Sequence, residues 1–208
     1  MTGIGKTVAL CVGFIAIVIA MFVFSKLRVP QLSEEELREQ GVFILPRPRD
    51  VAPFALAGGF TNESLKDKWS FIFFGFANCP DICPTSMAEM GKADLAIRDS
   101  GREGEHGFQG VLVSVDPDRD SHERVVNYAQ AFSPRFVGTV GAREALVELT
   151  QQVNVAFAKI PDGDGDFTVD HTGNIVIINP MGHYHGFMKL PHDAEIIRLT
   201  YQTLAARF

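Results

Sequence analysis

The hydrophobic positions of this chain fall into one long run near its start and a series of shorter runs after residue 50. The long run, Val8–Phe24, has 17 residues and no charged side chain. As a helix it would be about 26 Å long, at the short end of what crosses a hydrocarbon core of about 30 Å. Bulky residues end the run where a cleavable secretory signal would need small ones. The pattern predicts a single, uncleaved N-terminal transmembrane helix.

The shorter runs alternate between the spacing of strands and the spacing of helices. Three are continuous and apolar, which is typical of strands buried on both faces: residues 69–76, 110–115 and 175–178. A short strand at 135–139 and a turn at 179–182 that leads into a strand at 183–190 complete the predicted sheet. Helical spacing occupies residues 88–98, 122–132, 142–155 and 193–206. This order predicts an α/β, thioredoxin-like fold, with a central mixed sheet flanked by helices.

Three regions follow from these patterns. Residues 1–26 form the predicted membrane anchor, and residues 51–208 form one folded domain. Residues 27–50 read as a linker because they contain three prolines and the polar run Ser33–Glu36, which is also a possible helix start. The linker would hold the domain away from the membrane.

Composition narrows the function. The 208 residues carry a net charge of −6, and a pI near 5.5 leaves no basic surface for DNA or RNA, so we expect no nucleic-acid partner. Three cysteines are too few for a disulfide-stapled scaffold or a four-cysteine zinc module. The first of them, Cys11, lies inside the apolar run, where we expect it to face lipid or to be packed.

The other two cysteines stand where the first buried strand gives way to a helix, in the segment Cys79-Pro-Asp-Ile-Cys83-Pro84. Active sites of open α/β sheets lie at this end of a strand. If Pro84 occupies the first helical turn, Cys83 lies at or just before the helix start, where backbone N–H groups and the helix dipole stabilise a thiolate. Two thiols at this spacing can close a disulfide or hold one soft metal ion.

Copper suits two thiolates and one imidazole, whereas zinc in structural sites takes four ligands. The third ligand must then come from the six histidines, which are His106, His122, His171, His183, His185 and His192. His171 is predicted in a loop that enters the sheet opposite the cysteine loop, and the neighbouring Asp170 could orient its ring. From spacing alone, a purely structural histidine fits equally well.

Four motifs give the chain a specific resemblance. They are Gly75–Pro84 (GFANCPDICP), Val113–Asp120 (VSVDPDRD), Phe132–Pro134 (FSP) and Val169–Thr172 (VDHT). In this order they resemble the Sco/SenC family of copper-binding assembly factors for cytochrome c oxidase, and the resemblance covers roughly residues 50–207. It implies a thioredoxin-like domain that binds one copper ion, as Cu(I) or Cu(II), through Cys79, Cys83 and His171.

The resemblance also implies partners and a location. The copper would pass to subunit II of cytochrome c oxidase, whose binuclear copper site is also built on two cysteines, and it would come from an upstream periplasmic donor. The domain would face the periplasm from the bacterial inner membrane, or the intermembrane space from the mitochondrial inner membrane. Asp116 matches the family's D-P loop, where it could support the copper site or a docking surface, and it equally suits a turn that starts the next helix.

The main rival is enzymatic. Exchange between Cys79 and Cys83 would make the protein a thiol–disulfide oxidoreductase that keeps the copper-ligand cysteines of the oxidase reduced. The spacing of three residues between the cysteines, together with the facing histidine, favours a metal. A peroxidase is disfavoured because Phe76 stands where a peroxidatic site needs threonine.

Two further patterns carry weaker hypotheses. His183 and His185 fall on one face of a predicted strand and could form an auxiliary metal site, although a solvated strand explains them better. The segment Asp162–Asp166 (DGDGD) imitates a calcium loop, but it lacks the glycine and the glutamate that such a loop needs at its sixth and twelfth positions. An acidic hairpin is the better interpretation.

Overall fold

The computed structural model describes residues 2–27, 31–101, 103–161, 163 and 167–208. The chain divides into two compact units, residues 1–31 and 32–208. The first unit is helix α1 (Thr2–Leu27). No helix in the described part of the chain combines the length and the hydropathy of a membrane span.

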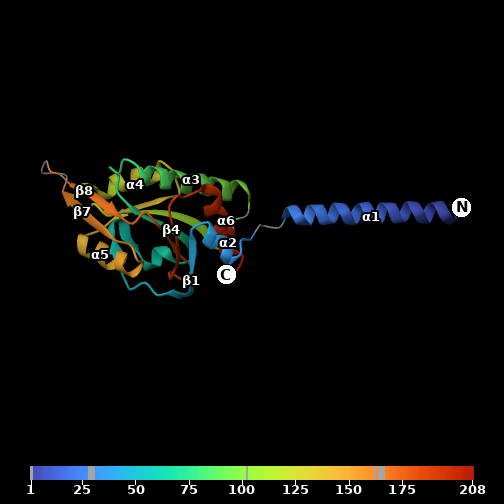
Figure 1. Ribbon diagram of the computed structural model, residues 1–208, viewed down its shortest axis with the longest axis horizontal. Coiled ribbons are helices and arrows are strands. Elements are labelled where there is room, and N and C mark those ends of the chain that lie inside the picture. Colours follow the sequence, from blue (N-terminus) through green and yellow to red (C-terminus); the bar gives the residue numbers. More distant parts are fainter. Residues whose placement is uncertain (1, 28–30, 102, 162, 164–166) are drawn as a thin grey trace. The chain divides into compact units, whose positions relative to one another are not determined.

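The second unit is built on a six-stranded sheet with the strand order β1-β10-β9-β4-β5-β6 (Figure 1). Its strands are β1 (Val42–Arg49), β4 (Lys68–Gly75), β5 (Gly107–Ser114), β6 (Val137–Val140), β9 (Ile175–Ile178) and β10 (Tyr184–Met188). Strands β4, β5 and β6 run parallel, while β4, β9, β10 and β1 alternate in direction. The sheet is therefore mixed, as the sequence predicts.

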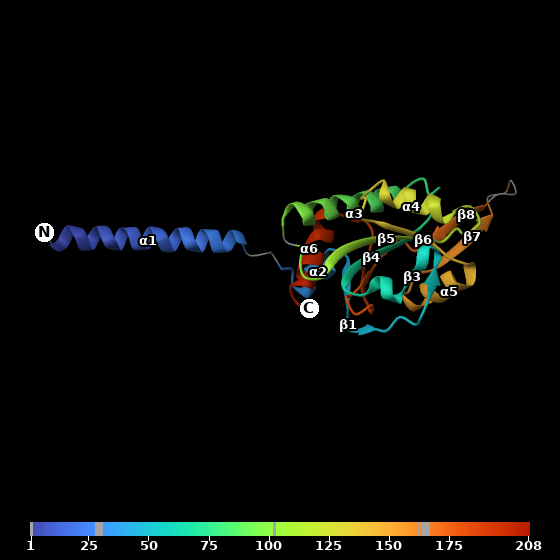
Figure 2. The same cartoon turned by 180° about the vertical axis from the view of Figure 1, so that it is seen from behind.

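Helices cover both faces of this sheet. They are α2 (Glu34–Glu39), α3 (Ile82–Asp99), α4 (His122–Gln130), α5 (Arg143–Gln152) and α6 (Ala194–Ala205). Figures 1 and 2 both show α3 and α4 along one side of the sheet and α5 on the other. Strand β4 lies between these layers, and seven of its eight residues are buried. Its apolar, aromatic sequence reflects burial on both faces.

The predicted α/β, thioredoxin-like arrangement is confirmed, and most predicted elements lie within a few residues of the observed ones. Strand β9 has the predicted bounds, residues 175–178. Helix α3 begins six residues earlier than the apolar spacing suggests, at Ile82, because its first turns carry the cysteine motif rather than a regular apolar stripe. Helix α6 begins after Asp193, whose carboxylate accepts the N–H groups of Glu195 and Ile196.

The predicted linker is wrong over much of its length. Residues 34–39 form α2, which begins with a capping box between Ser33 and Glu36, and residues 42–49 form β1, which pairs with β10. Leu37 and Val42 are fully buried in the domain core. Prolines suggested a spacer, but a strand at the edge of a sheet tolerates proline because its outer N–H groups have no strand partner.

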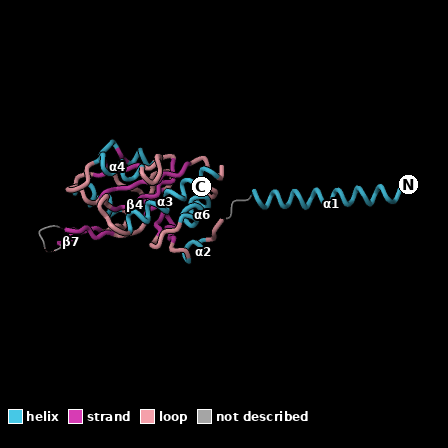
Figure 3. The backbone as a smooth tube through the Cα atoms, turned by 90° about the horizontal axis from the view of Figure 1, so that it is seen from above, coloured by secondary structure: helices cyan, strands magenta, loops and turns pink. Residues whose placement is uncertain are grey.

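Smaller elements complete the domain. They are β2 (Ala55–Leu56), β3 (Phe60–Thr61), the 3₁₀ turns η1 (Ala57–Gly59) and η2 (Asn62–Leu65), and the hairpin strands β7 (Phe157–Pro161) and β8 (Phe167–His171). Strands β7 and β8 pair with each other as a separate two-stranded sheet, visible at the margin of the domain in Figure 3. Most of the acidic segment Asp162–Asp166, which separates them, lies outside the described residues.

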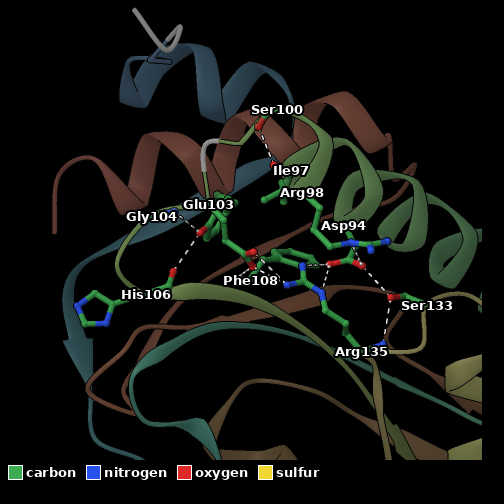
Figure 4. Close-up of polar contacts among 11 residues, drawn as sticks. Asp94, Ile97, Arg98, Ser100, Glu103, Gly104, His106, Phe108, Ser133 and Arg135 are labelled. Carbon is green, nitrogen blue, oxygen red and sulfur yellow. Dashed lines mark hydrogen bonds and ion pairs between the residues drawn. The ribbon is translucent and has the colours of Figure 1, made fainter. Parts of the chain in front are cut away.

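A network of charged and polar side chains joins the second half of α3 to the segment just before β6 (Figure 4). The fully buried Asp94 carboxylate accepts the Ser133 hydroxyl at 2.7 Å and the Arg135 guanidinium, and it forms an ion pair with Arg98 at 3.4 Å. Arg135 also reaches Glu103 at 2.8 Å. Ser133 belongs to the FSP motif, so this motif holds the fold together at a distance from the cysteines.

Candidate metal centre

Three potential ligand atoms come together at the carboxyl end of β4. The sulfur atoms of Cys79 and Cys83 and a ring nitrogen of His171 all lie within 4.8 Å of one another. The Cys83 sulfur and the His171 Nε2 are 3.6 Å apart. Cys79 lies in the loop after β4, Cys83 in the first turn of α3, and His171 at the end of β8. Three segments that are distant in sequence therefore build one site.

Cys83 is held in the interior. Helix α3 begins at Ile82, so Cys83 and Pro84 both belong to its first turn, as the proline predicts. The Cys83 side chain is fully buried. A methyl group on Gly75 would lie only 2.8 Å from the Cys83 sulfur, so glycine at the end of β4 allows the sulfur to approach the strand. Cys79, by contrast, is only partly buried.

The two thiols differ in acidity. A hydrogen bond from Cys83, assisted by His171, lowers the pKa of Cys79 to about 4 against the opposing effect of burial. The same hydrogen bond to Cys79, together with burial, raises the pKa of Cys83. The expectation that the helix start makes Cys83 the thiolate is therefore wrong: the hydrogen bond to Cys79 and the burial of Cys83 outweigh the helix dipole, and Cys79 is the more acidic of the two thiols.

His171 ends a strand rather than lying in the predicted loop. The Phe73 and Phe76 rings contact its ring edge to face, each at 5.8 Å between ring centres. Its Nδ1 lies 3.3 Å from the Thr172 carbonyl oxygen. The Asp170 side chain is exposed on the other face of β8, so among the described contacts a backbone carbonyl, and not Asp170, accompanies the ring nitrogen.

Asp120 supports the cysteine loop, and the sequence did not single it out. This buried carboxylate accepts the backbone N–H of Ala77 at 2.9 Å and the Ser114 hydroxyl at 2.6 Å. It thereby fixes the loop before Cys79 to the end of β5. The clue was its place in the DPDRD motif, but its contact with Ala77 depends on the fold.

Asp116 supports the other side of the site through Arg119. It is fully buried, and its carboxylate receives the Arg119 guanidinium at 2.5 Å. Arg119 also donates to the Phe167 carbonyl oxygen at 2.9 Å and lies over the Phe167 ring. Asp116 thus connects to the hairpin that carries His171, and its carbonyl accepts the N–H of Asp120 in the predicted turn. A buried carboxylate offers no docking surface.

The two cysteines also affect Tyr128 on α4. Burial first, and then negative charge at the cysteine pair, raise the pKa of its phenol to about 12. Its buried hydroxyl has no hydrogen-bond partner among the described residues. Sequence inspection gave no signal for Tyr128, because its proximity to the cysteines arises from the packing of α4 beside them.

The remaining sequence hypotheses point away from this centre. His183 pairs with Asp50 at 3.1 Å, while His185 contacts the edge of the Trp69 ring. They do not join an acidic or sulfur ligand in a group of three, since Cys79, Cys83 and His171 form the one such cluster among the described residues. Cys11 is exposed on α1.

The donor set determines which ion fits. Two sulfur atoms and one imidazole nitrogen are soft to intermediate ligands, and three of them suit Cu(I) in a trigonal arrangement. A low thiol pKa at Cys79 favours metal binding because the ligand is already deprotonated at neutral pH. A structural zinc site would need a fourth ligand, which the cluster does not supply.

Comparisons with known proteins agree with this geometry. The sequence model of the family described as SCO1/SenC matches residues 51–205. A "putative copper-binding protein" of Stutzerimonas stutzeri is 33% identical over 159 residues, covering 74% of this chain and 76% of that protein. The mitochondrial SCO1 homologue of Homo sapiens is 32% identical over 165 residues, covering 76% of this chain and 52% of its own length. The chain thus spans about half the length of the human relative.

Solved structures show the same fold. The copper-bound ScoI of Arabidopsis thaliana is 28% identical, with a TM-score of 0.68, over 76% of this chain and 98% of that one. The apo Sco1 of Thermus thermophilus is 31% identical, also with a TM-score of 0.68, over 79% and 95%. The family match covers both cysteines and the histidine of the centre. With these motifs, this fold and this cluster, the chain belongs to the SCO1/SenC family.

Proposed function

We propose that this protein binds one copper ion through Cys79, Cys83 and His171 and delivers it to the binuclear copper site of cytochrome c oxidase subunit II. The observation that carries the proposal is the convergence of the three ligand atoms within 4.8 Å. The copper-bound relative from Arabidopsis thaliana supports the choice of metal. The four sequence motifs support the oxidase as recipient, since they resemble a family of oxidase assembly factors.

The unequal burial of the two cysteines suggests how copper leaves. Cys83 is enclosed, whereas Cys79 is partly exposed and is the more acidic thiol. A cysteine of the recipient can therefore approach the ion from the side of Cys79 and replace it first, while Cys83 and His171 still hold the ion. Stepwise exchange of ligands moves copper without releasing it into water.

The proposal includes an anchor and a location. The apolar run 8–24 supports a membrane-inserted α1, as do its large exposed side chains, such as Leu10 at 74% and Phe14 at 68%. We place the copper domain in the periplasm of a bacterium, on the outer side of the inner membrane, where an upstream periplasmic donor would load it. The corresponding mitochondrial location is the alternative.

Copper binding is tested with the full-length chain in detergent, with Cys11→Ser in every sample so that only two thiols remain. The parent is expected to bind one copper ion and to show a Cu(II)–thiolate absorption band. Cys79→Ser, Cys83→Ser and His171→Ala should each abolish or strongly weaken that band, while the control His183→Ala should leave it unchanged. Full copper occupancy with an unaltered band in any of the three ligand variants contradicts the site.

Delivery is tested separately. The copper-loaded protein is mixed with the metal-free copper domain of oxidase subunit II, with its cysteines reduced, and the two are separated and analysed for copper. Transfer should proceed in the presence of a chelator that captures free copper. If the copper stays on this protein or reaches only the chelator, the delivery step is wrong, although binding still stands.

Thiol–disulfide exchange is the second candidate, and the acidity of Cys79 next to a protonated Cys83 favours it. The Cys79 thiolate would attack a disulfide of the oxidase subunit, and Cys83 would then resolve the mixed disulfide after losing its proton. The recipient gains two electrons, and the proton of Cys83 together with one proton from water completes its two thiols, while Cys79 and Cys83 become a disulfide. Reduction of an oxidised subunit II by the copper-free protein, lost in Cys79→Ser, would establish this activity.

A further inference from the structure

His192 lies buried immediately before α6, and neither the proposed ligands nor the family motifs include it. Its Nδ1 is 2.8 Å from the hydroxyl oxygen of Ser86, and its Nε2 is 3.4 Å from the carbonyl oxygen of Met188. A carbonyl oxygen can only accept, so Nε2 carries a proton. Burial lowers the pKa of His192 and keeps the ring neutral, so Nδ1 accepts the proton of the Ser86 hydroxyl, and the imidazole connects α3 to the end of β10.

Through its contact with Ser86, His192 lies next to the turn of α3 that carries Cys83. Ser86 follows Cys83 by three residues in α3, so the two side chains lie on the same buried face of the helix, about one turn apart. A second bond from α6, between the Ala194 N–H and the Glu89 carboxylate at 3.0 Å, fixes the next turn of α3. The start of α6 thus holds the part of α3 that carries Cys83.

Phe73 gives a second route to the site. Its fully buried ring meets His192 at 6.1 Å and His171 at 5.8 Å between ring centres, edge to face in both contacts. A methyl group on Gly75 would lie 2.8 Å from the Cys83 sulfur and 2.9 Å from the Phe73 ring, so the sulfur and the ring flank the same glycine. His192 therefore contacts neighbours of two of the three ligands.

We propose that His192 is a positioning residue of the copper centre: its hydrogen bond to Ser86 and its contact with Phe73 set the separation between the Cys83 sulfur and the His171 ring. This inference rests on the proposed copper site. Burial lowers the pKa of His192 to about 4, so the imidazole keeps its neutral form, and both hydrogen bonds, at neutral pH. It is a support for ligands and not itself a ligand, because both its nitrogen atoms are engaged.

The experiment uses the full-length Cys11→Ser protein. Ser86→Ala removes the hydrogen-bond donor, and His192→Phe keeps an aromatic ring while removing both nitrogen atoms. Ser70→Ala is the matched control, because Ser70 is also fully buried and donates to Gln109 at 3.0 Å, but at the opposite end of β4 from the cysteines. Each sample is examined for copper affinity, for its Cu(II) absorption and paramagnetic resonance spectra, and for thermal stability.

Ser86→Ala and His192→Phe should still bind one copper ion, with altered Cu(II) spectra and copper affinity reduced about tenfold or more, the range seen when outer supports of metal ligands are lost. Ser70→Ala should lose thermal stability but keep the parent spectrum. If the spectra and affinity of both test variants match those of Ser70→Ala, His192 is a purely structural residue and the inference is overturned. Ser86→Ala alone decides the question if His192→Phe does not fold.

A metal-free measurement separates this inference from the function on which it rests. With Cys79 also replaced by serine, the rate at which a small alkylating reagent modifies Cys83 reports how firmly its sulfur is held. We expect Ser86→Ala to raise that rate at least severalfold, and Ser70→Ala to leave it unchanged. If the parent binds no copper, the proposed function fails, and the alkylation rates still decide whether His192 fixes Cys83.

Discussion

The two ends of α3 use polar groups in opposite ways. Near its C-terminal end, Asp94 is buried among a serine and two arginines that satisfy its charge. About 16 Å away along the helix, the first turn carries Cys83, whose sulfur meets the Cys79 thiol, the His171 ring and the Phe76 backbone, with no charged side chain of opposite sign among these contacts. Because its partners satisfy its charge, Asp94 stabilises the fold. The Cys83 sulfur keeps electron pairs that can bind a metal ion. Stability and function are therefore separated along one helix.

The strongest test of this separation is Asp94→Ala. It leaves the half-buried Arg135 without its main partner, and we expect the free energy of unfolding to fall by about 3–5 kcal/mol. Urea unfolding measures the loss, and Asp94→Asn, which keeps hydrogen-bonding atoms, should lose less. Copper bound per folded molecule should stay at the parent value. A parallel loss of copper binding by the folded fraction would show that the two ends are coupled.

Acid should destabilise the protein through His192. Its pKa is about 4 when folded and near 6.5 when unfolded, so below pH 6.5 the unfolded chain gains a proton that the folded one does not take up until about pH 4. The stabilisation from a neutral His192 is complete above pH 6.5 and falls by about 3 kcal/mol as the pH drops to 4. Between pH 4 and 6.5 the unfolding free energy of the parent should therefore rise with pH more steeply than that of His192→Phe, and above pH 6.5 the two should change with pH in the same way. If the two proteins show the same pH dependence below pH 6.5 as well, the low pKa of His192 is refuted.

Gly75→Ala probes the functional end more gently. The new methyl group would press on the Cys83 sulfur and on Phe73, so we expect about 1–3 kcal/mol of destabilisation together with an altered copper spectrum. Gly104→Ala is the control, since its methyl group would have no neighbour closer than 3.5 Å. Calorimetry and the Cu(II) absorption measure the two effects. A normal spectrum in Gly75→Ala would mean that Cys83 is not confined by the strand.

The smallest expected effect comes from Phe167→Leu. The Phe167 ring contacts the cations of both Arg119 and Lys159, and each such contact stabilises by roughly 0.5–1 kcal/mol. Loss of the ring should loosen the hairpin and speed the release of copper to a chelator a few-fold. Phe43 on β1 contacts Lys189 in the same way, and Phe43→Leu should leave the release rate unchanged. Equal release rates in the two variants would show that the β7–β8 hairpin does not help to retain copper.

The sequence predicted the parts of the fold with strong periodicity. Continuous apolar runs and regular helical spacing located β4, β9 and α6 to within a few residues. The acidic segment 162–166 was interpreted as a hairpin, but the two strands on either side of it, β7 and β8, were not predicted because their residues are largely exposed. Strand β1 was missed because Pro46 and Pro48 resemble a spacer, whereas the strand is defined by its pairing with β10, far later in the chain, as in Val42 with Met188.

The ligands of the candidate site were predictable, but their supports were not. Cysteine spacing suggested a metal, and family resemblance selected His171 among six histidines. No local pattern shows that Asp120 accepts the Ala77 N–H, or that a hydrogen bond to Cys79 and burial raise the pKa of Cys83. These properties arise when distant segments pack together, so they require the folded structure.

The edge strand β1 affects how copies of this protein can associate. Strand β1 ends in four exposed residues that alternate proline with arginine, from Pro46 to Arg49. Proline offers no N–H to a neighbouring strand, and like charges repel an identical edge. This border of the sheet therefore resists joining the same border of another copy, which protects crowded molecules from fusing into a continuous sheet and aggregating.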